Sequence, residues 1–233
     1  MKVGMASSLS KIPDLTLELG GSKIEFKECV KYLGVQLDNT LSMKNQISSV
    51  CRACFLELRR IASIKKYLNK EALITLISTK VLSRLDYCNS TYSGIPDEQL
   101  KRLQRVQNAA ARLILNKRKK DHITPLLKKL HWLPVKERCD YKIATLSFRF
   151  FEGSLAPSLA SSLQEYRPIR NLRSSSAKLL KSQRFCLKSA GGRSFSVTAP
   201  RIWNNLPHSI RHSQTLDIFK RRLKTHLFNR SFI

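Results

Sequence analysis

Polar and apolar residues alternate in two short stretches near the N-terminus. The first spans residues 14–19, the pair Gly20-Gly21 follows, and the second stretch spans 23–27. A period of two on either side of a Gly-Gly turn predicts a β-hairpin. Residues 30–38 predict a third strand, and Gly34 inside it indicates a bulge or the close approach of another backbone.

Apolar residues recur at spacings of three and four from about Ser42 onwards, which is the period of an amphipathic helix. The pattern predicts three successive helices, over about 42–61, 69–85 and 97–115. Asn69 is suited to cap the second of them, because its side chain can accept a hydrogen bond from the first turn.

The second half of the chain predicts helices over 135–151, 156–163 and 216–227. Residues 164–200 are rich in Ser and Arg, and we expect a loop there with short strands such as 194–198.

The expected fold class is therefore mainly α (α+β), in three consecutive parts. These are a β-hairpin and strand unit (1–41), a helical bundle (42–121) and a basic, irregularly helical C-terminal region (122–233).

The distribution of charge changes this picture more than the composition does. The chain has 233 residues with 43 Lys or Arg and 16 Asp or Glu, a net charge of +27. Residues 1–40 are neutral, whereas 41–121 carry 17 basic and six acidic side chains and 161–233 carry 15 and two. Such a surplus opposes compaction unless a polyanion neutralises it, and nucleic acid is the usual partner. Solubility alone is the alternative explanation, but mixed signs would serve it as well.

The predicted helix over 97–115 carries part of this charge in an ordered way. Its apolar residues fall on one half of a helical wheel, and a polar stripe about 60° wide runs along the other half. The stripe consists of Lys101, Arg105, Asn108 and Arg112. A solvated basic face explains the stripe as well as phosphate contact does.

Two further basic groups favour phosphate contact. One continues the charge beyond the end of that helix, as Lys117, Arg118, Lys119 and Lys120. The other lies opposite the apolar face of the last predicted helix, as Lys220, Arg221 and Lys224.

Candidate chemistry is sparse by comparison. Cys51 and Cys54 form a C-x-x-C pair, but both fall in the apolar stripe of a predicted helix and no second pair lies at zinc-finger spacing. We therefore expect two small buried hydrophobes. The Asp residues are scattered rather than clustered for two metal ions, and no P-loop, G-x-S-x-G or H-E-x-x-H motif occurs. The sequence predicts no catalytic centre, no metal and no cofactor.

Four aromatic residues are candidates for stacking on bases: Tyr32, Trp132, Phe195 and Trp203. Each has apolar neighbours, which favours packing in a core over stacking.

The chain shows no sign of an extracellular or membrane protein. Six Cys in 233 residues are too few for a disulfide scaffold, no apolar run is long enough to span a bilayer, and residues 1–10 lack the apolar stretch of a secretory signal. We expect an intracellular protein, nuclear or cytoplasmic, with reduced thiols and no membrane contact.

A series of motifs adds a family resemblance. In order, they are residues 30–38 (VKYLGVQLD), 85–89 (LDYCN), 106–114 (VQNAAARLI), 130–138 (LHWLPVKER), 172–175 (LRSS), 193–207 (RSFSVTAPRIWNNLP) and 219–228 (FKRRLKTHLF). The series covers almost the whole chain, and it resembles the reverse transcriptases of non-long-terminal-repeat retrotransposons (LINE elements), of the chicken-repeat and related clades.

The resemblance implies which part of such an enzyme the chain represents. Fingers and palm, with the metal-binding Asp residues of the family, would lie upstream, so no catalytic residue is carried over. Residues 1–3 would be the end of a palm segment, and a primer grip would lie at about 29–38, in which we expect Lys31, Tyr32 and Gly34 to approach the primer. A helical thumb (about 42–116) and a C-terminal region (about 122–233) would follow. The expected partner is RNA, DNA or an RNA–DNA hybrid, held through its phosphates.

Two other functions remain open. In one, a separate chain that bears the palm completes the apolar stripes of the first and third helices, and this chain is a protein-interaction module. Alternatively, the chain is a translated transposon relic without a function.

Overall fold

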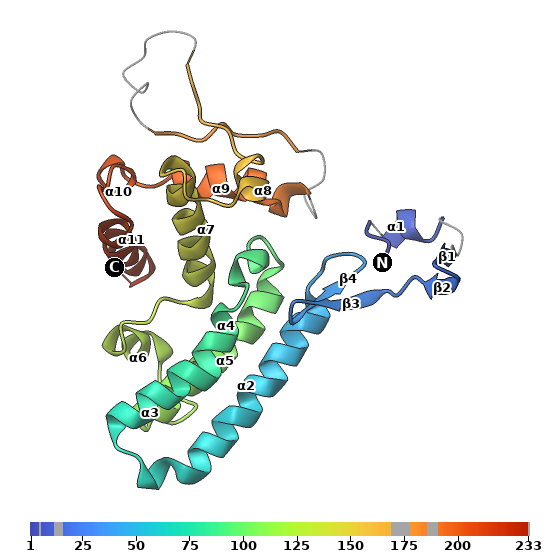
Figure 1. Ribbon diagram of the computed structural model, residues 1–233. Coiled ribbons are helices and arrows are strands. Elements are labelled where there is room, and N and C mark those ends of the chain that lie inside the picture. The colour runs from blue at the N-terminus through green and yellow to red at the C-terminus, as the bar shows by residue number, and fades with distance from the viewer. Residues whose placement is uncertain (5, 12–15, 169–177, 186–190, 233) are drawn as a thin grey trace.

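The computed structural model of the chain describes residues 1–4, 6–11, 16–168, 178–185 and 191–232 (Figure 1). It is mainly helical, with two small antiparallel sheets of two strands each, and this confirms the predicted fold class. The motif at 172–175 and most of the central part of the 164–200 stretch lie outside the described residues.

The first hairpin forms as predicted. After a short helix, α1 (Ala6–Leu9), strands β1 (Thr16–Leu19) and β2 (Ser22–Glu25) pair across Gly20 and Gly21, which both have positive φ. Residues 14 and 15 of the predicted first strand lie outside the described residues. The hairpin stands away from the helical body in Figure 1, and β2 is exposed along its whole length.

The single strand predicted over 30–38 is wrong. The segment folds back on itself as a second hairpin, with β3 (Cys29–Tyr32) paired to β4 (Val35–Asp38). Leu33 and Gly34 form the turn at φ 46° and 83°, and left-handed geometry at both positions is typical of a tight turn between twisted strands. The glycine therefore reverses the chain instead of forming a bulge.

Asp38 connects this hairpin to the first long helix, α2 (Lys44–Ile64). Its buried carboxylate accepts hydrogen bonds from the backbone N–H groups of Thr40, Ser42 and Met43 at 2.8–3.2 Å and from the hydroxyls of Thr40 and Ser42 at 2.7 and 3.1 Å. Burial acts to raise the pKa of Asp38, but these hydrogen bonds outweigh it and hold the pKa below 3.8.

The long helices of the bundle agree with the sequence pattern. The predicted stripe of α2 is buried and packs against α5 (Asp97–Leu115), whose bounds match the prediction. Between them the chain passes through η1 (Lys65–Tyr67), α3 (Lys70–Ile77), the π-helical turn η2 (Ser78–Leu82), α4 (Ser83–Asp86) and η3 (Asn89–Tyr92). Asn69 caps α3 as expected, because its Oδ1 accepts from the Ala72 N–H at 2.8 Å.

The first helix after the bundle was not predicted. α6 (Ile123–Lys129) spans seven residues, too few to give a clear period, and contains Pro125 in its first turn, where proline is tolerated. Leu126 and Leu127 pack with Ala111 of α5 in a small buried cluster, so tertiary contact stabilises this helix.

α7 (Val135–Phe151) joins two hydrophobic cores. Its first turns contribute Val135 and Cys139 to the core of the bundle, and its later turns contribute Ile143 and Phe148 to a second core. The second core is completed by later helices, namely α8 (Pro157–Ala160), α9 (Phe195–Asn204), α10 (His208–Arg211) and α11 (Leu216–Phe232).

The strand predicted over 194–198 is wrong, because Phe195 to Thr198 form the first turn of α9. Ser and Thr alternate with Phe and Val in this segment, which is also the sequence pattern of a half-buried strand. Farther along, Ala199 and Trp203 recur at helical spacing, both are fully buried against α7, and this packing decides the helix.

Arg193, in the turn η4 (Gly191–Arg193), ties the C-terminal region back to the start of the bundle. Its Nη2 donates to the Leu41 carbonyl at 2.9 Å, and its side chain lies over Gly94. Burial lowers the pKa of the guanidinium, and the nearby Asp38 carboxylate partly offsets that effect.

Candidate nucleic-acid interface

The predicted primer-grip residues lie at the tip of the second hairpin. Lys31 is exposed and Tyr32 has 64% of its surface exposed. A residue outside the hairpin supports the turn. The hydroxyl of Tyr87, which follows α4, donates to the Leu33 carbonyl at 2.6 Å. The hairpin therefore presents a cation and an aromatic ring on a supported turn, with Gly34 supplying the positive φ.

The stripe on α5 is shorter than its sequence pattern suggests. Lys101 and Arg105 are exposed. Asn108 accepts a hydrogen bond from Gln104 Nε2 at 2.8 Å, and Arg112 is half-buried and donates to the Asp121 carbonyl at 3.1 Å. Asn108 and Arg112 thus serve the structure around α5, and the solvent-facing charge of the stripe is that of its first two cations.

The tetrabasic run forms the loop between α5 and α6. α5 ends at Asn116, which has a left-handed backbone, and the loop is closed where Asp121 Oδ2 accepts from the Arg118 N–H at 2.6 Å. The four side chains of the run, Lys117, Arg118, Lys119 and Lys120, are all exposed. They form a compact cationic loop at the C-terminal end of the helix, where positive charge also interacts favourably with the helix dipole.

The three cations predicted on α11 separate into different surroundings. Lys220 lies 3.7 Å from Asp217 on its own helix. Arg221 lines a groove of about 750 Å³ between α10 and α11, whereas Lys224 lines a different cavity beside α7.

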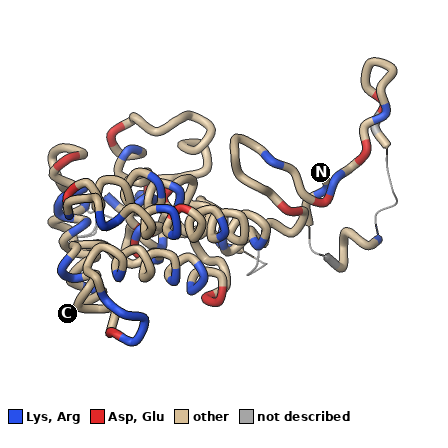
Figure 2. Tube along the Cα trace, turned by 90° about the horizontal axis from the view of Figure 1, so that it is seen from below, with Lys and Arg blue, Asp and Glu red and all other residues tan. Residues whose placement is uncertain are grey.

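The positive charge as a whole is little neutralised. Among the residues that the structure describes, seven ion pairs form, and most of them are at the surface. Figure 2 shows Lys and Arg positions recurring over the helical body, on several elements. Exposed cations on several helices suit a polyanion that contacts more than one element.

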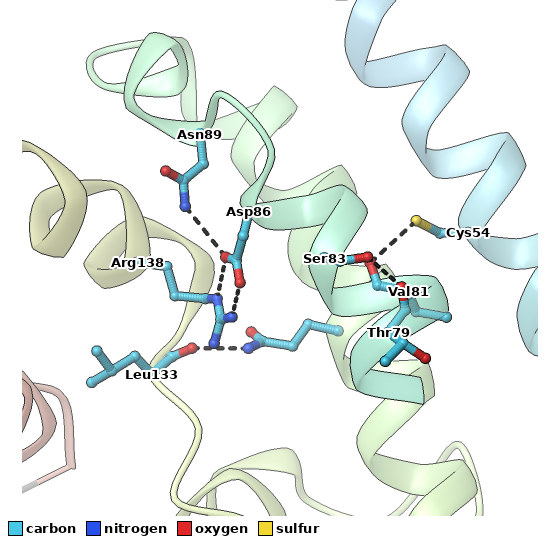
Figure 3. A network of polar contacts seen from close by, with 9 residues as sticks. Cys54, Thr79, Val81, Ser83, Asp86, Asn89, Leu133 and Arg138 are labelled. Atoms are coloured by element: carbon cyan, nitrogen blue, oxygen red, sulfur yellow. Dashed lines mark hydrogen bonds and ion pairs between the residues drawn. The ribbon is translucent and has the colours of Figure 1, made fainter. Parts of the chain in front are cut away.

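A part-buried polar network between α4, η3 and α7 was missed by sequence reasoning. The Asp86 carboxylate accepts from Arg138 Nε at 2.7 Å and pairs with Arg138 Nη2, while Asn89 Nδ2 donates to Asp86 Oδ1 at 3.3 Å (Figure 3). The pair joins the end of α4 to α7 across 52 sequence positions. The sequence held one indication of this pair, since Asp86 lies in the motif 85–89 and Arg138 in the motif 130–138.

Two glutamines of α5 hold the turn that precedes α7. Gln107, fully buried, donates its Nε2 to the Leu133 carbonyl at 2.8 Å, and Gln104 Oε1 accepts from the Val135 N–H at 2.9 Å. The turn at 131–134, which lies within the motif 130–138, is therefore held against the bundle by two hydrogen bonds.

The aromatic candidates separate by burial. Trp203 is fully buried and Phe195 and Trp132 are partly buried against the cores, whereas Tyr32 is exposed. Trp203 Nε1 also donates to the Lys178 carbonyl at 2.7 Å. Of the four, Tyr32 is the most exposed.

The cysteines are placed for packing. Cys51 and Cys54 are buried in the bundle core as expected, and burial raises the pKa of the Cys54 thiol to about 11 and of Cys139 to about 12. Thiols with such pKa values are poor nucleophiles and poor metal ligands. Within the described ranges, no three His, Cys, Asp or Glu side chains converge to hold a metal ion.

In the part of the chain that the structure covers, no helix has the length and apolar character that crossing a membrane requires. No protein-family model matches this chain, and neither a curated protein nor a solved structure matches it significantly.

Proposed function

We propose that this chain binds template–primer nucleic acid through backbone phosphates, as the thumb and C-terminal portion of a LINE-type reverse transcriptase, and that it carries out no bond-making step by itself. The observation that carries the proposal is the net charge of +27, with exposed cations on the helical body of which few form ion pairs within the described residues. Each phosphate contact releases condensed counterions, so binding of this kind is tight at low salt and insensitive to base sequence.

Support for the family comes from where its motifs lie. Motif 85–89 supplies Asp86 and motif 130–138 supplies Arg138, and these two residues form the ion pair between α4 and α7. Motif 193–207 supplies both Arg193, which contacts Leu41, and Trp203, which fills the second core. Motifs that meet in space are expected if the series belongs to one ancestral fold.

The test is a titration of the protein into a labelled RNA–DNA hybrid at rising NaCl. We expect log K to fall linearly with log [NaCl], with a slope of about −0.9 per phosphate contact on a B-form duplex and less on single strands. A flat response, or no binding at low salt, would contradict the proposal.

Two variants of equal charge locate the contacts. Changing Lys117, Lys119 and Lys120 to Gln removes three exposed charges from the loop after α5, and changing Lys11, Lys23 and Lys27 to Gln removes three from the neutral N-terminal segment. The first variant should weaken binding to every sequence alike and flatten the slope by up to about 3 × 0.9, whereas the second should do neither. Equal effects would indicate a diffuse charge effect without a contact surface.

Primer extension with Mg²⁺ and deoxynucleotides should give no product with this chain alone. Product formation would overturn the proposed lack of catalysis.

The first hairpin favours a second candidate function, a contact with a palm-bearing chain. The stripes of α2 and α5 that suggested a partner pack against each other within this chain. Exposed apolar side chains remain on the hairpins, however, at Leu19, Ile24, Tyr32 and Leu33. An isolated two-stranded hairpin is marginal in water, so a covering partner would stabilise it. Light scattering with a palm fragment tests this, and a monomer that ignores the fragment counts against it.

On either proposal the chain would act inside the cell, in the nucleus or cytoplasm, where its partners are. The third alternative, a relic without a function, predicts a poorly folded chain, and a cooperative thermal transition would speak against it.

A further inference from the structure

A cavity of about 360 Å³ lies where the end of α4, the turn at 131–134, α7 and α11 meet. This volume is at the small end of the range for small-molecule sites and suits one nucleotide rather than a duplex. Polar and aromatic side chains from four separate parts of the chain line it, and the phosphate contacts proposed above do not account for them.

Asn89 supplies a hydrogen-bond acceptor that the protein does not use. The residue lines the cavity and is only 4% exposed, its Nδ2 donates to Asp86, and its Oδ1 has no hydrogen-bond partner. The orientation of the amide is determined by its surroundings, because the reverse orientation would place Oδ1 against the Asp86 carboxylate (Figure 3). A buried acceptor without a donor is rare and calls for a donor from outside the chain.

Aromatic rings form part of the cavity wall. His131, Trp132 and Tyr141 line it, and the His131 ring packs on Phe228 of α11 with 5.7 Å between ring centroids. Two residues of α5 hold the backbone of the turn that carries His131 and Trp132, through hydrogen bonds to the Leu133 carbonyl and from the Val135 N–H. Flat aromatic walls suit the faces of a nucleobase.

Two cations complete the lining. Lys142 of α7 and Lys224 of α11 are both exposed, and both line the cavity. Arg138 is already engaged by Asp86, so these two lysines are the groups available to a phosphate.

We propose that this cavity holds one unstacked nucleotide of the bound nucleic acid, with a base that carries an exocyclic amino group. The amino group of adenine or cytosine donates to Asn89 Oδ1, the ring lies against the aromatic wall, and the phosphate meets Lys142 and Lys224. This inference rests on the proposed function, since it names where a single-stranded end or an extruded base would be held.

The test uses nucleoside monophosphates as probes, measured by calorimetry on the full chain. We expect AMP and CMP to bind about tenfold more tightly than UMP, whose base offers no amino group to Asn89. Asn89→Leu, similar in size but without the acceptor, should abolish this discrimination between AMP or CMP and UMP.

A second pair of variants keeps the test decisive if Asn89→Leu fails to fold. Lys224→Gln should weaken AMP binding several-fold and leave adenosine binding unchanged, because only the phosphate contact is lost. Arg221→Gln, an exposed neighbour on the same helix that lines the other groove, should change neither.

The possible failures are distinguishable. A chain that binds the hybrid but no monophosphate overturns this inference alone. Equal binding of AMP and UMP does the same, and so does an AMP affinity that Lys224→Gln leaves unchanged. A chain that binds neither hybrid nor monophosphate overturns the proposed function as well.

Discussion

At the scale of single residues, Arg193 shows how one side chain connects distant parts of the fold. It reaches from the C-terminal region across 152 sequence positions to the Leu41 carbonyl, next to the point where the second hairpin enters α2. Its Cγ lies where a side chain at position 94 would begin, so Gly94 is needed for this contact. The tie between the two halves of the molecule therefore depends on a glycine as well as on an arginine.

A glycine pair tests this dependence. Gly94 and Gly153 have almost the same positive φ, 74° and 73°, but a Cβ at 94 would lie 2.8 Å from Arg193 Cγ, whereas a Cβ at 153 meets nothing within 4 Å. Gly153→Ala should lower the free energy of unfolding by about 1 kcal/mol through backbone strain alone. Gly94→Ala should cost about 1 kcal/mol more, because Arg193 must move.

Urea unfolding followed by circular dichroism measures both variants. Equal losses of unfolding free energy in the two variants would show that the clash with Arg193 adds nothing to the backbone strain.

Residues of the α5 stripe show a limit of sequence reasoning at this scale. A helical wheel places Arg112 and Asn108 on a polar face, but it does not tell what covers that face. The loop that ends at Asp121 returns over Arg112, and Gln104 reaches Asn108, so both polar groups are used inside the protein.

At the scale of elements, the junction between β4 and α2 is held by one carboxylate. Asp38 accepts five hydrogen bonds from the three residues Thr40, Ser42 and Met43, which fixes the direction in which α2 leaves the hairpin. Met43 sits at positive φ in this junction, a conformation that a non-glycine residue adopts only with support from its surroundings.

The lowered pKa of Asp38 predicts how stability depends on pH. Its pKa is below 3.8 in the folded state, so the folded protein binds fewer protons, and the carboxylate stabilises the fold above that pH and loses its effect as the pH falls through the folded pKa. Asp38→Asn keeps the shape and loses the charge. At pH 6 we expect it to be less stable than the parent by about 1–2 kcal/mol, and at pH 3 the gap should narrow.

Urea unfolding of both proteins at the two pH values gives the comparison. A gap of the same size at pH 3 and pH 6 would mean that the charge of Asp38 plays no part.

Long helices were predicted well and short ones poorly, for a physical reason. α5 and α7 span 19 and 17 residues, enough for several turns of periodic pattern. α6 and the first turn of α9 are too short to show a period, and their conformation is decided by what they pack against, since helices of this length are unstable in isolation.

At the scale of the whole molecule, two hydrophobic cores share α7 and the surface is strongly cationic. The cores must hold the chain together against the mutual repulsion of a net charge of +27. Ions that screen the repulsion should therefore stabilise the fold.

This predicts a melting temperature that rises with ionic strength. Between about 20 and 200 mM NaCl the Debye length shortens about threefold, and we expect a gain of about 1 kcal/mol, or about 2–4 °C. The variant with Lys117, Lys119 and Lys120 changed to Gln carries less charge and should gain less. Differential scanning calorimetry is the measurement, and a melting temperature that stays constant or falls with salt would count against strong repulsion.

Composition and periodicity, which are local properties of the chain, were enough to establish the mainly helical class, the positions of the long helices and the burial of Cys51 and Cys54. Local pattern does not reveal what lies across a helix or which distant side chain completes a hydrogen bond. The pairing of Asp86 with Arg138, the reach of Arg193 to Leu41 and the unused acceptor of Asn89 depend on residues brought together from remote parts of the sequence. Only the folded arrangement decided them, because the free energy of a polar group is set by its neighbours in space.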